Sequence, residues 1–340
     1  MRVKLEEVCE RGSSNLKQSD VVKMSGKYPI YGASGHIGNA DFYHQDKPYV
    51  SVIKDGAGIG RAYLNSAKSS VIGTMQYLLP KNNVIPKYLY YVIRYMHLEK
   101  YYTGATIPHI YYKDYKNEQF NLASLEKQER VVEVLEKCEK IINNRRSEIG
   151  KLDELIKARF VEMFGTIKKE ELLGNICEFV TVGIANSATH AYSDSGIPML
   201  RNQNIRENYL DDRDLVYIKP EFASKYESKK LKENDIIIMR TGYPGIACLV
   251  PKKYEGCQTF TTLIARLKPN NNPNYICSYI NSYFGKKFIE LEKVGVAQQN
   301  VGAKSLAKMP IKMAPQNLQD EFADFVHQID KSKVVFDIQF

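Results

Sequence analysis

The side chains that could perform chemistry are thinly spread along this chain of 340 residues. Its six histidines and six cysteines show no zinc-site spacing, and no P-loop or Gly-x-Ser-x-Gly nucleophile turn is present. Gly56-Ala57-Gly58-Ile59-Gly60 differs from a dinucleotide-binding turn, because its third glycine comes early and a strand pattern follows. We therefore expect no catalytic residue, no metal site and no cofactor bound by this chain.

Residue types that read nucleic acid are, in contrast, concentrated in a few short segments. Arginine can pair with guanine O6 and N7, and asparagine or glutamine with adenine N6 and N7. The candidate DNA-binding residues are Lys54, Arg61, Arg201, Asn202, Gln203, Asn204, Arg206, Arg240, Thr241, Tyr243 and Gln298. The alternative is that these side chains only brace their own loops, because Asn and Gln are also ordinary turn formers.

The charge distribution favours a polyanionic partner for the two ends of the chain. The formal net charge is +9, of which residues 1–124 carry +6, residues 125–163 carry none and residues 164–340 carry +3. No apolar run approaches the roughly 18 residues of a membrane-spanning helix. Cysteines without a pairing pattern are typical of reduced thiols, so we expect a cytoplasmic protein that does not enter a membrane.

The elements that would position the candidate residues form an internal repeat. Leu5-x-x-Val8-Cys9-Glu10 recurs as Leu173-x-x-Ile176-Cys177-Glu178, and Pro86-x-Tyr88-Leu89 recurs as Pro273-x-Tyr275-Ile276. Between these phrases, each copy has a buried strand pattern, a glycine turn and a returning strand, at 49–64 and 235–250. The same order of matches predicts two similar modules with mixed α/β (α+β) folds.

A long helix is predicted to join the two modules. Residues 125–163 contain no proline and a single glycine, and charged residues surround an apolar stripe. The stripe consists of Leu135, Ile142, Ile149, Ile156 and Met163. At ~1.5 Å per residue such a helix is about 60 Å long, and its stripe needs a partner.

A second, shorter helix is predicted to begin near Pro315, with Phe322, Phe325, Val326 and Ile329 on one face. We expect this face to pack against part of the long helix and the 142–156 region to remain for assembly. The pattern predicts a break near Lys333, because residues 334–340 resemble a strand or a loose tail more than a continued heptad.

This ordered set of features resembles the DNA specificity subunit of type I restriction–modification systems. The resemblance rests on the duplicated module, on Leu125-Glu126-Lys127-Gln128-Glu129 with its counterpart Asn317-Leu318-Gln319-Asp320-Glu321, and on the ending Phe160-x-x-Met163-Phe164-Gly165. It implies target recognition domains at 1–124 and 166–314, a coiled-coil spacer helix at 125–165, and a short C-terminal helix and tail at 315–340.

The resemblance also implies a function and partners. Each domain would read one half of a bipartite site on double-stranded DNA, and the helices would dock methyltransferase subunits, with restriction or motor subunits joining them. The chain would be a non-catalytic subunit of a type I restriction endonuclease and adenine-specific DNA methyltransferase complex. S-adenosylmethionine, ATP and Mg²⁺ would belong to the partner subunits.

Other readings of the sequence stay open at this point. The chain could be a stand-alone DNA-modifying or DNA-cleaving enzyme of related ancestry. It could also be a coiled-coil scaffold with protein-binding end modules. Self-association through the long helix is a further possibility that the apolar stripe leaves open.

Overall fold

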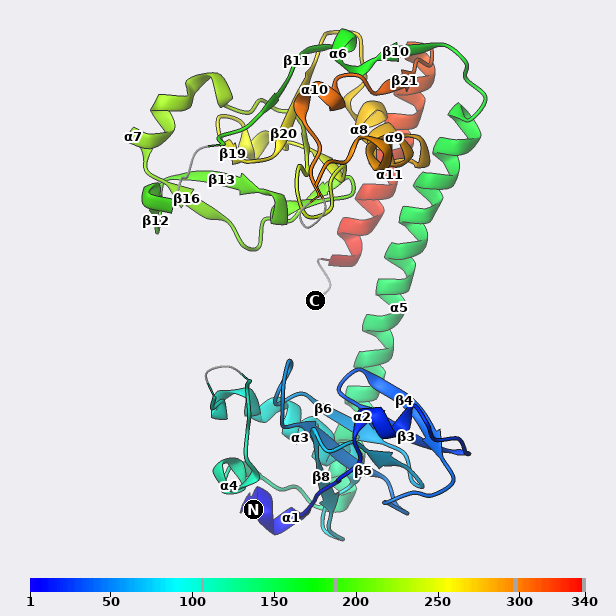
Figure 1. Ribbon diagram of the computed structural model, residues 1–340, viewed down its shortest axis with the longest axis vertical. Coiled ribbons are helices and arrows are strands. Elements are labelled where there is room, and N and C mark those ends of the chain that lie inside the picture. The colour runs from blue at the N-terminus through cyan, green and yellow to red at the C-terminus, as the bar shows by residue number, and fades with distance from the viewer. Residues whose placement is uncertain (105–106, 186–188, 296–298, 338–340) are drawn as a thin grey trace. The chain divides into compact units, whose positions relative to one another are not determined.

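The computed structural model describes residues 1–104, 107–185, 189–295 and 299–337. The chain forms two compact units, unit 1 (Met1–Asn144) and unit 2 (Arg145–Phe340), each described by itself. The long helix α5 (Leu125–Phe164) supplies its first turns to unit 1 and its last turns to unit 2. Figure 1 shows the course of the chain.

Unit 1 contains two small sheets and a strand pair ahead of α5. Its elements in chain order are β1 (Arg2–Lys4), α1 (Leu5–Val8), β2 (Cys9–Gly12), α2 (Gln18–Val21), β3 (Tyr28–Gly32), β4 (Gly35–Ala40), β5 (Tyr49–Ile53), β6 (Ala62–Asn65), β7 (Ser70–Val71), β8 (Met75–Pro80), α3 (Pro86–Met96), η1 (Leu98–Tyr101), α4 (Tyr112–Tyr115) and β9 (Gln119–Asn121). The sheet orders are β2-β8-β5-β6 and β4-β3-β7, and β1 pairs with β9.

The central strand β5 explains how unit 1 builds its core. All five of its residues are buried, so it has apolar neighbours on both faces. Val50 and Val52 pack in one cluster with Leu89 and Ile93 of α3, which begins with Pro86 in its first turn. Ile53 faces the other sheet through Ile30 and Val71. The sequence pattern of a continuous apolar strand followed by a Pro-led helix therefore produces a sheet covered on both sides.

Unit 2 repeats this arrangement after α5. Its elements are β10 (Glu170–Leu172), α6 (Leu173–Ile176), β11 (Cys177–Val182), η2 (Thr189–Ala191), β12 (Tyr192–Ser193), β13 (Ile197–Arg201), η3 (Asn202–Asn204), β14 (Ile205–Arg206), β15 (Tyr209–Leu210), β16 (Val216–Ile218), α7 (Pro220–Ala223), η4 (Ser224–Lys229), β17 (Ile236–Ile238), β18 (Ala247–Leu249), η5 (Lys252–Tyr254), β19 (Gln258–Phe260), β20 (Leu263–Leu267), α8 (Pro273–Asn281), α9 (Tyr283–Glu292), α10 (Ala303–Leu306), β21 (Pro310–Lys312) and α11 (Gln316–Asp337).

The strand orders confirm the predicted repeat. The sheet β11-β20-β17-β18 of unit 2 has the order of β2-β8-β5-β6 in unit 1, and β10 pairs with β21 as β1 pairs with β9. Each second sheet contains one parallel pair, β3 with β7 and β13 with β19. Both units are therefore built on one plan, with mixed α/β folds as the sequence predicted.

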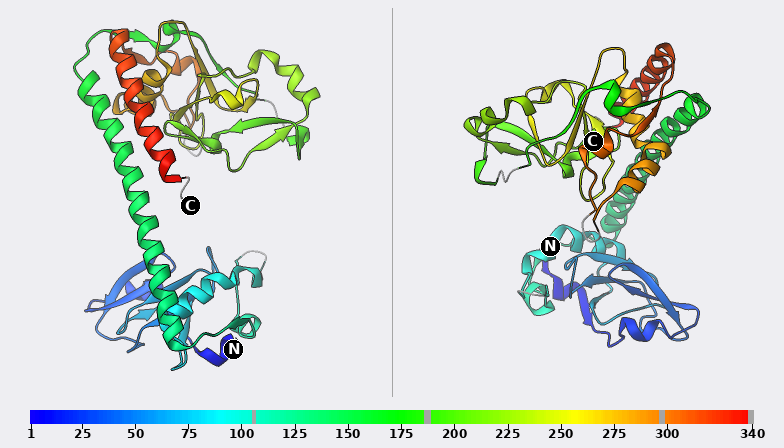
Figure 2. Two further views of the ribbon diagram at one scale, coloured as in Figure 1. Left: turned by 180° about the vertical axis from the view of Figure 1, so that it is seen from behind. Right: turned by 45° about the horizontal axis from the view of Figure 1, so that its top comes forward.

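The C-terminal helix packs on the last turns of α5 within unit 2 (Figures 1 and 2). Phe322 and Val326 of α11 share a buried cluster with Phe160 and Phe164 of α5, and Phe325 and Ile329 pack against that cluster. The predicted break near Lys333 is wrong, because α11 continues to Asp337. The physical reason is that the Lys333 ammonium lies 2.7 Å from Asp153 of α5 and 3.0 Å from Asp330, which holds this turn helical. Residues 338–340 lie outside the described part of the chain.

The predicted apolar stripe of α5 is covered unevenly. Ile156 is buried and belongs to the core of unit 2, and Met163 packs against that core. Leu135 and Ile149 are half-buried, whereas Ile142 is 37% exposed. Ile156 therefore serves the fold of unit 2 and is not free for another subunit.

Candidate nucleic-acid interface

Three loops converge at one edge of unit 2. The Asn202 amide donates to the Thr241 hydroxyl over 2.9 Å, and its oxygen accepts the Arg240 backbone N–H over 3.2 Å. Thr241 pairs in turn with Asn300 in an isolated antiparallel bridge, and the Val301 N–H donates to the Arg240 carbonyl over 3.2 Å. Three segments that are far apart in the sequence, around Asn202, Thr241 and Asn300, thus lie together in the structure.

Unit 1 has the same backbone frame with different side chains. The Ile110 N–H donates to the Lys54 carbonyl over 2.9 Å, as Val301 does to Arg240. Asp55 bridges His109 where Thr241 bridges Asn300, and the His109 Nδ1 lies 2.7 Å from the Asp55 carboxylate. Both turns then pass through a left-handed glycine, Gly56 at φ +88° and Gly242 at φ +82°, where a Cβ would be strained.

Arg201, at the end of β13, and Arg206 are held by two aspartates that sequence reasoning missed. The Arg201 guanidinium donates to the Asp214 carbonyl over 2.9 Å, and the Gln203 amide donates to the Asp214 carboxylate over 2.9 Å. Arg206 lies 3.2 Å from the Asp211 carboxylate. No periodic pattern marks these acids in the sequence, because the loop that carries them closes through tertiary hydrogen bonds.

Asn204 braces the loop rather than facing outward. It is buried at 1% exposure, its side-chain oxygen accepts the Arg201 N–H over 2.9 Å, and its amide donates to the Asp211 carbonyl over 3.0 Å. All of its polar atoms are therefore used inside the protein. For this residue, the bracing alternative describes the structure better than base reading.

The other candidates of unit 2 differ in what they offer an outside partner. The Nε atoms of Arg201 and Arg240 are buried and have no hydrogen-bond partner within the described residues, so a partner outside the protein does not reach them. Tyr243, in contrast, is 76% exposed at the tip of the turn between β17 and β18.

The unit 1 candidates lie around the equivalent turn. The Lys54 ammonium is 4.0 Å from the Asp55 carboxylate, and the exposed Arg61 donates from Nε to the Gly58 carbonyl over 3.3 Å. Gln298 lies outside the described residues. His109 was not predicted, although its place before the last short helix of the first repeat matches that of Asn300 in the second.

The positive charges of the unit 2 loops are partly neutralised by a nearby aspartate. The hydrogen bond from Arg213 lowers the pKa of Asp211 to about 2, with further help from the nearby Arg206 charge. The Asp211 carboxylate is therefore ionised at neutral pH and holds both guanidinium groups. The Arg213 side chain is 85% exposed, and its guanidinium group pairs with the Asp211 carboxylate at 2.7 Å.

The remaining reactive groups behave as structural residues. Burial raises the pKa of the Cys9 and Cys177 thiols to about 12, so both stay protonated. Among the described residues, no group of three or more His, Cys, Asp or Glu could hold a metal ion. In the same part of the chain, no helix combines the length and the apolar character that crossing a bilayer requires.

A family model for the type I restriction modification DNA specificity domain matches residues 1–151 and 168–335. The chain belongs to this family. Each matched segment contains one loop frame, which is the backbone closed by Ile110 on Lys54 in unit 1 and by Val301 on Arg240 in unit 2. The structural repeat and the two parts of the family match therefore coincide. The chain is thus a DNA sequence specificity subunit, the component of type I restriction–modification systems that is not itself catalytic.

Solved structures share the fold across nearly the whole specificity subunit. The S subunit of a type I restriction–modification system from M. genitalium is 15% identical with a TM-score of 0.58, covering 100% of this chain and 91% of that chain. A structure from work on complex assembly and conformational transition of a type I system is 14% identical with a TM-score of 0.51, covering 99% and 91%. No curated protein matches the sequence.

Proposed function

We propose that each unit of this specificity subunit reads one half of a bipartite target on double-stranded DNA. The observation that carries the proposal is the loop frame that occurs twice, closed by Ile110 on Lys54 in unit 1 and by Val301 on Arg240 in unit 2. A backbone frame that closes in the same way in both units but holds different side chains suits two readers of different sequences. Base edges are read by side chains, whereas backbone and phosphate contacts only position them.

Within unit 2, we assign different tasks to different side chains. Arg240, at the start of the turn that Asn202 contacts, suits a phosphate oxygen, because a guanidinium group is a strong donor to phosphate. Gln203 and Arg201 are more suitable for base edges, because they lie at the end of β13 and in the turn η3 that follows it, and each donates a hydrogen bond to Asp214. Asn204 supports the loop.

The proposed complex also needs catalytic partners. The exposed part of the α5 stripe around Ile142 would dock methyltransferase subunits, which would bring S-adenosylmethionine, and motor-nuclease subunits would bring ATP and Mg²⁺. Since the substrate is cellular DNA, we place the complex in the cytoplasm. Without these subunits, the chain is expected neither to methylate nor to cut plasmid DNA in the presence of S-adenosylmethionine, ATP and Mg²⁺.

Selection of preferred sequences from a random duplex library tests the bipartite reading. The unaltered chain should enrich two short motifs at a fixed spacing. Gln203→Ala should relax one motif by about 1–3 kcal/mol at the affected base pair and leave the other unchanged. His109→Ala in unit 1 should relax the other motif and leave the motif that depends on Gln203 unchanged.

The outcome that contradicts the proposal is equally specific. If Gln203→Ala lowers the melting temperature while both motifs persist, Gln203 only braces its loop. If either variant changes both motifs together, the two units do not read independent half-sites.

A further inference from the structure

One histidine at the loop frame of unit 1 has a backbone that is held on two sides. The His109 N–H donates to the Thr103 carbonyl over 2.8 Å, and the Thr103 N–H donates to the His109 carbonyl over 2.9 Å. The carbonyl of the preceding residue, Pro108, accepts the Gly56 N–H over 2.9 Å. The main chain therefore fixes where the imidazole begins.

The imidazole ring itself is oriented by two neighbours. Its Nδ1 atom lies 2.7 Å from Oδ1 of Asp55, and the Tyr111 ring stacks on it with 6.2 Å between centroids and 20° between the ring planes. The second carboxylate oxygen of Asp55, Oδ2, lies 4.0 Å from the Lys54 ammonium. One edge and one face of the His109 ring are thus occupied within unit 1.

The hydrogen bond to Asp55 decides which ring nitrogen carries the proton. A carboxylate only accepts hydrogen bonds, so Nδ1 of His109 is the donor. In a neutral imidazole, the other nitrogen, Nε2, is then an acceptor. The described residues offer Nε2 no hydrogen bond, and the His109 side chain is 35% exposed. Unit 1 therefore presents a fixed acceptor at its loop frame.

Unit 2 has no such bias at the equivalent position. Asn300 takes the place of His109 there, and it bridges Thr241 as His109 bridges Asp55. An asparagine amide carries a donor and an acceptor side by side, so it can pair with either kind of group. A lone acceptor, in contrast, can pair only with a donor.

The major-groove edges of the four bases differ in the same property. Adenine and cytosine carry the amino groups N6 and N4, which donate, whereas guanine and thymine carry the oxygens O6 and O4, which accept. We propose that His109, positioned by Asp55, makes unit 1 select an adenine or a cytosine at one base pair of its half-target. The inference rests on the proposed reading of one half-target by each unit.

Asp55→Asn tests the proposal, because it should exchange the roles of the two ring nitrogens of His109. The Lys54 ammonium beside Oδ2 favours the amide oxygen on its own side, which turns the amide NH₂ toward Nδ1. Nδ1 then accepts a hydrogen bond, and Nε2 carries the proton as a donor. The selected base should change from adenine or cytosine to guanine or thymine.

Selection from a random duplex library, at about pH 8.5 to keep the imidazole neutral, identifies the base pair. Fluorescence anisotropy then compares duplexes that differ only there. The unaltered chain should bind the adenine or cytosine duplex about fivefold more tightly than the guanine or thymine duplex, as expected for one hydrogen bond. The ratio should invert for Asp55→Asn, and His109→Ala should bind the duplexes equally.

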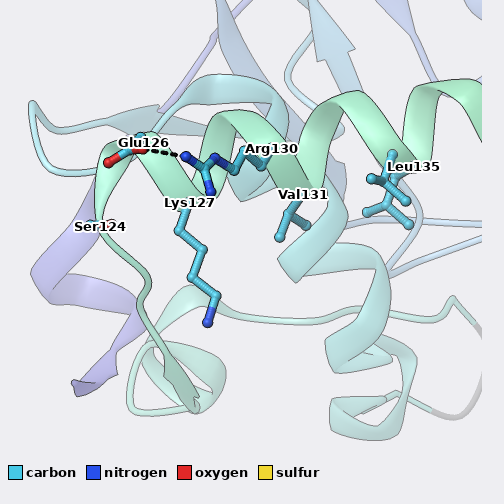
Figure 3. A pocket seen from close by; sticks show the side chains of 7 residues that line it. Ser124, Glu126, Lys127, Arg130, Val131 and Leu135 are labelled. Carbon is cyan, nitrogen blue, oxygen red and sulfur yellow. Dashed lines mark hydrogen bonds and ion pairs between the residues drawn. The ribbon is translucent and has the colours of Figure 1, made fainter.

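The matched control is Glu126→Gln, which also exchanges a carboxylate for an amide in unit 1. Glu126 pairs with Arg130 of α5 at 2.6 Å, beside a hollow that no residue of the loop frame lines (Figure 3). This variant should keep the base preference of the unaltered chain. The motif read by unit 2 should persist in every variant.

Nitrogen-15 NMR of the histidine-labelled chain without DNA gives a second readout, because protonated and unprotonated ring nitrogens resonate at different frequencies. The signals of His109 are identified by their loss in His109→Ala. We expect a protonated Nδ1 in the unaltered chain and a protonated Nε2 in Asp55→Asn.

Three results would overturn the proposal while two motifs are still selected. The first is a preference for guanine or thymine by the unaltered chain, and the second is a preference that His109→Ala retains. The third is an exchange of the ring nitrogens in Asp55→Asn with an unchanged base preference, which would mean that His109 only braces its loop. Failure of the proposed function looks different, because the unaltered chain would then select no pair of motifs at all, and both proposals would fall.

Discussion

At the scale of single residues, the unit 2 loops balance cations against acids. Asp211 holds Arg206 and Arg213, and Asp214 holds Arg201 and Gln203. At the proposed interface, a DNA strand would have to compete with these aspartates for the cations, and the loss of each internal contact would reduce the net gain in free energy on binding. Affinity and discrimination are then separable, because phosphate contacts add to every sequence alike.

Asp211→Asn is expected to lower the free energy of unfolding by about 1 kcal/mol near neutral pH, because two guanidinium groups lose their carboxylate. Since the folded pKa of Asp211 is about 2 against an ordinary 3.8, its contribution is present above about pH 4 and is lost as the pH falls toward 2. Urea titrations of both chains should therefore converge in acid. A difference that stays constant down to about pH 2 would show that charge pairing is not its cause.

Arg240→Ala is expected to weaken binding to all duplexes alike and to flatten the plot of log affinity against log salt by about 0.9, if Arg240 contacts one phosphate. Lys151→Ala removes the same charge from an exposed position of α5, away from the loops, and should leave the slope unchanged. Equal slopes for Arg240→Ala and the unaltered chain would remove Arg240 from the interface.

At the scale of elements, the buried glutamines join each recognition module to its helix. Gln128 and Gln319 are 0% and 2% exposed, and their amides also donate to the carbonyls of Ala123 and Ala314, just ahead of the helices. In each unit, the glutamine side chain therefore connects three segments: the end of the preceding strand, the start of the helix, and the loop before α3 or α8. In the sequence, this joint is marked by Leu125-x-x-Gln128 in the first repeat and by Gln316-x-x-Gln319 in the second.

Gln319→Ala is expected to destabilise unit 2 by about 1–3 kcal/mol, because the Asn272 N–H and the Ala314 carbonyl lose a buried partner. Gln316→Ala, one turn earlier on the exposed face of α11, should change stability by less than about 0.5 kcal/mol. Equilibrium unfolding in urea measures both. Equal effects of the two substitutions would mean that the joint does not depend on the buried amide.

The elements were predictable from sequence where local patterns determine them. The 40-residue α5 follows from its apolar stripe and the scarcity of helix breakers, and β5 and β17 follow from their apolar runs. The end of α11 was predicted wrongly, because the ion pair between Lys333 and Asp153 joins residues of two helices. The partners of the loop arginines, Asp211 and Asp214, were missed for the same reason, since only the folded chain brings them within reach.

At the scale of the whole molecule, the proposed docking face on α5 would keep assembly apart from DNA recognition. Ile142→Asp is expected to abolish co-purification with methyltransferase subunits, because it places a charge on the proposed docking face, while the chain alone keeps its DNA affinity. Val22→Asp, at an apolar residue of unit 1 that is 82% exposed, should affect neither. Retention of the methyltransferase by Ile142→Asp in a pull-down would place the docking face elsewhere.

The backbone closure of each loop frame has a consequence for how new specificities arise. The bonds from Ile110 to Lys54 and from Val301 to Arg240 join main-chain atoms only, so they place no demand on side-chain identity. Mutations at Asp55, His109 or Asn300 can therefore accumulate while these main-chain bonds stay in place, whereas a change at Thr241 also removes the hydroxyl to which Asn202 donates. If each unit reads one half-target, such a chain would acquire a new half-target by drift or by exchange of one module and would inherit the other unchanged.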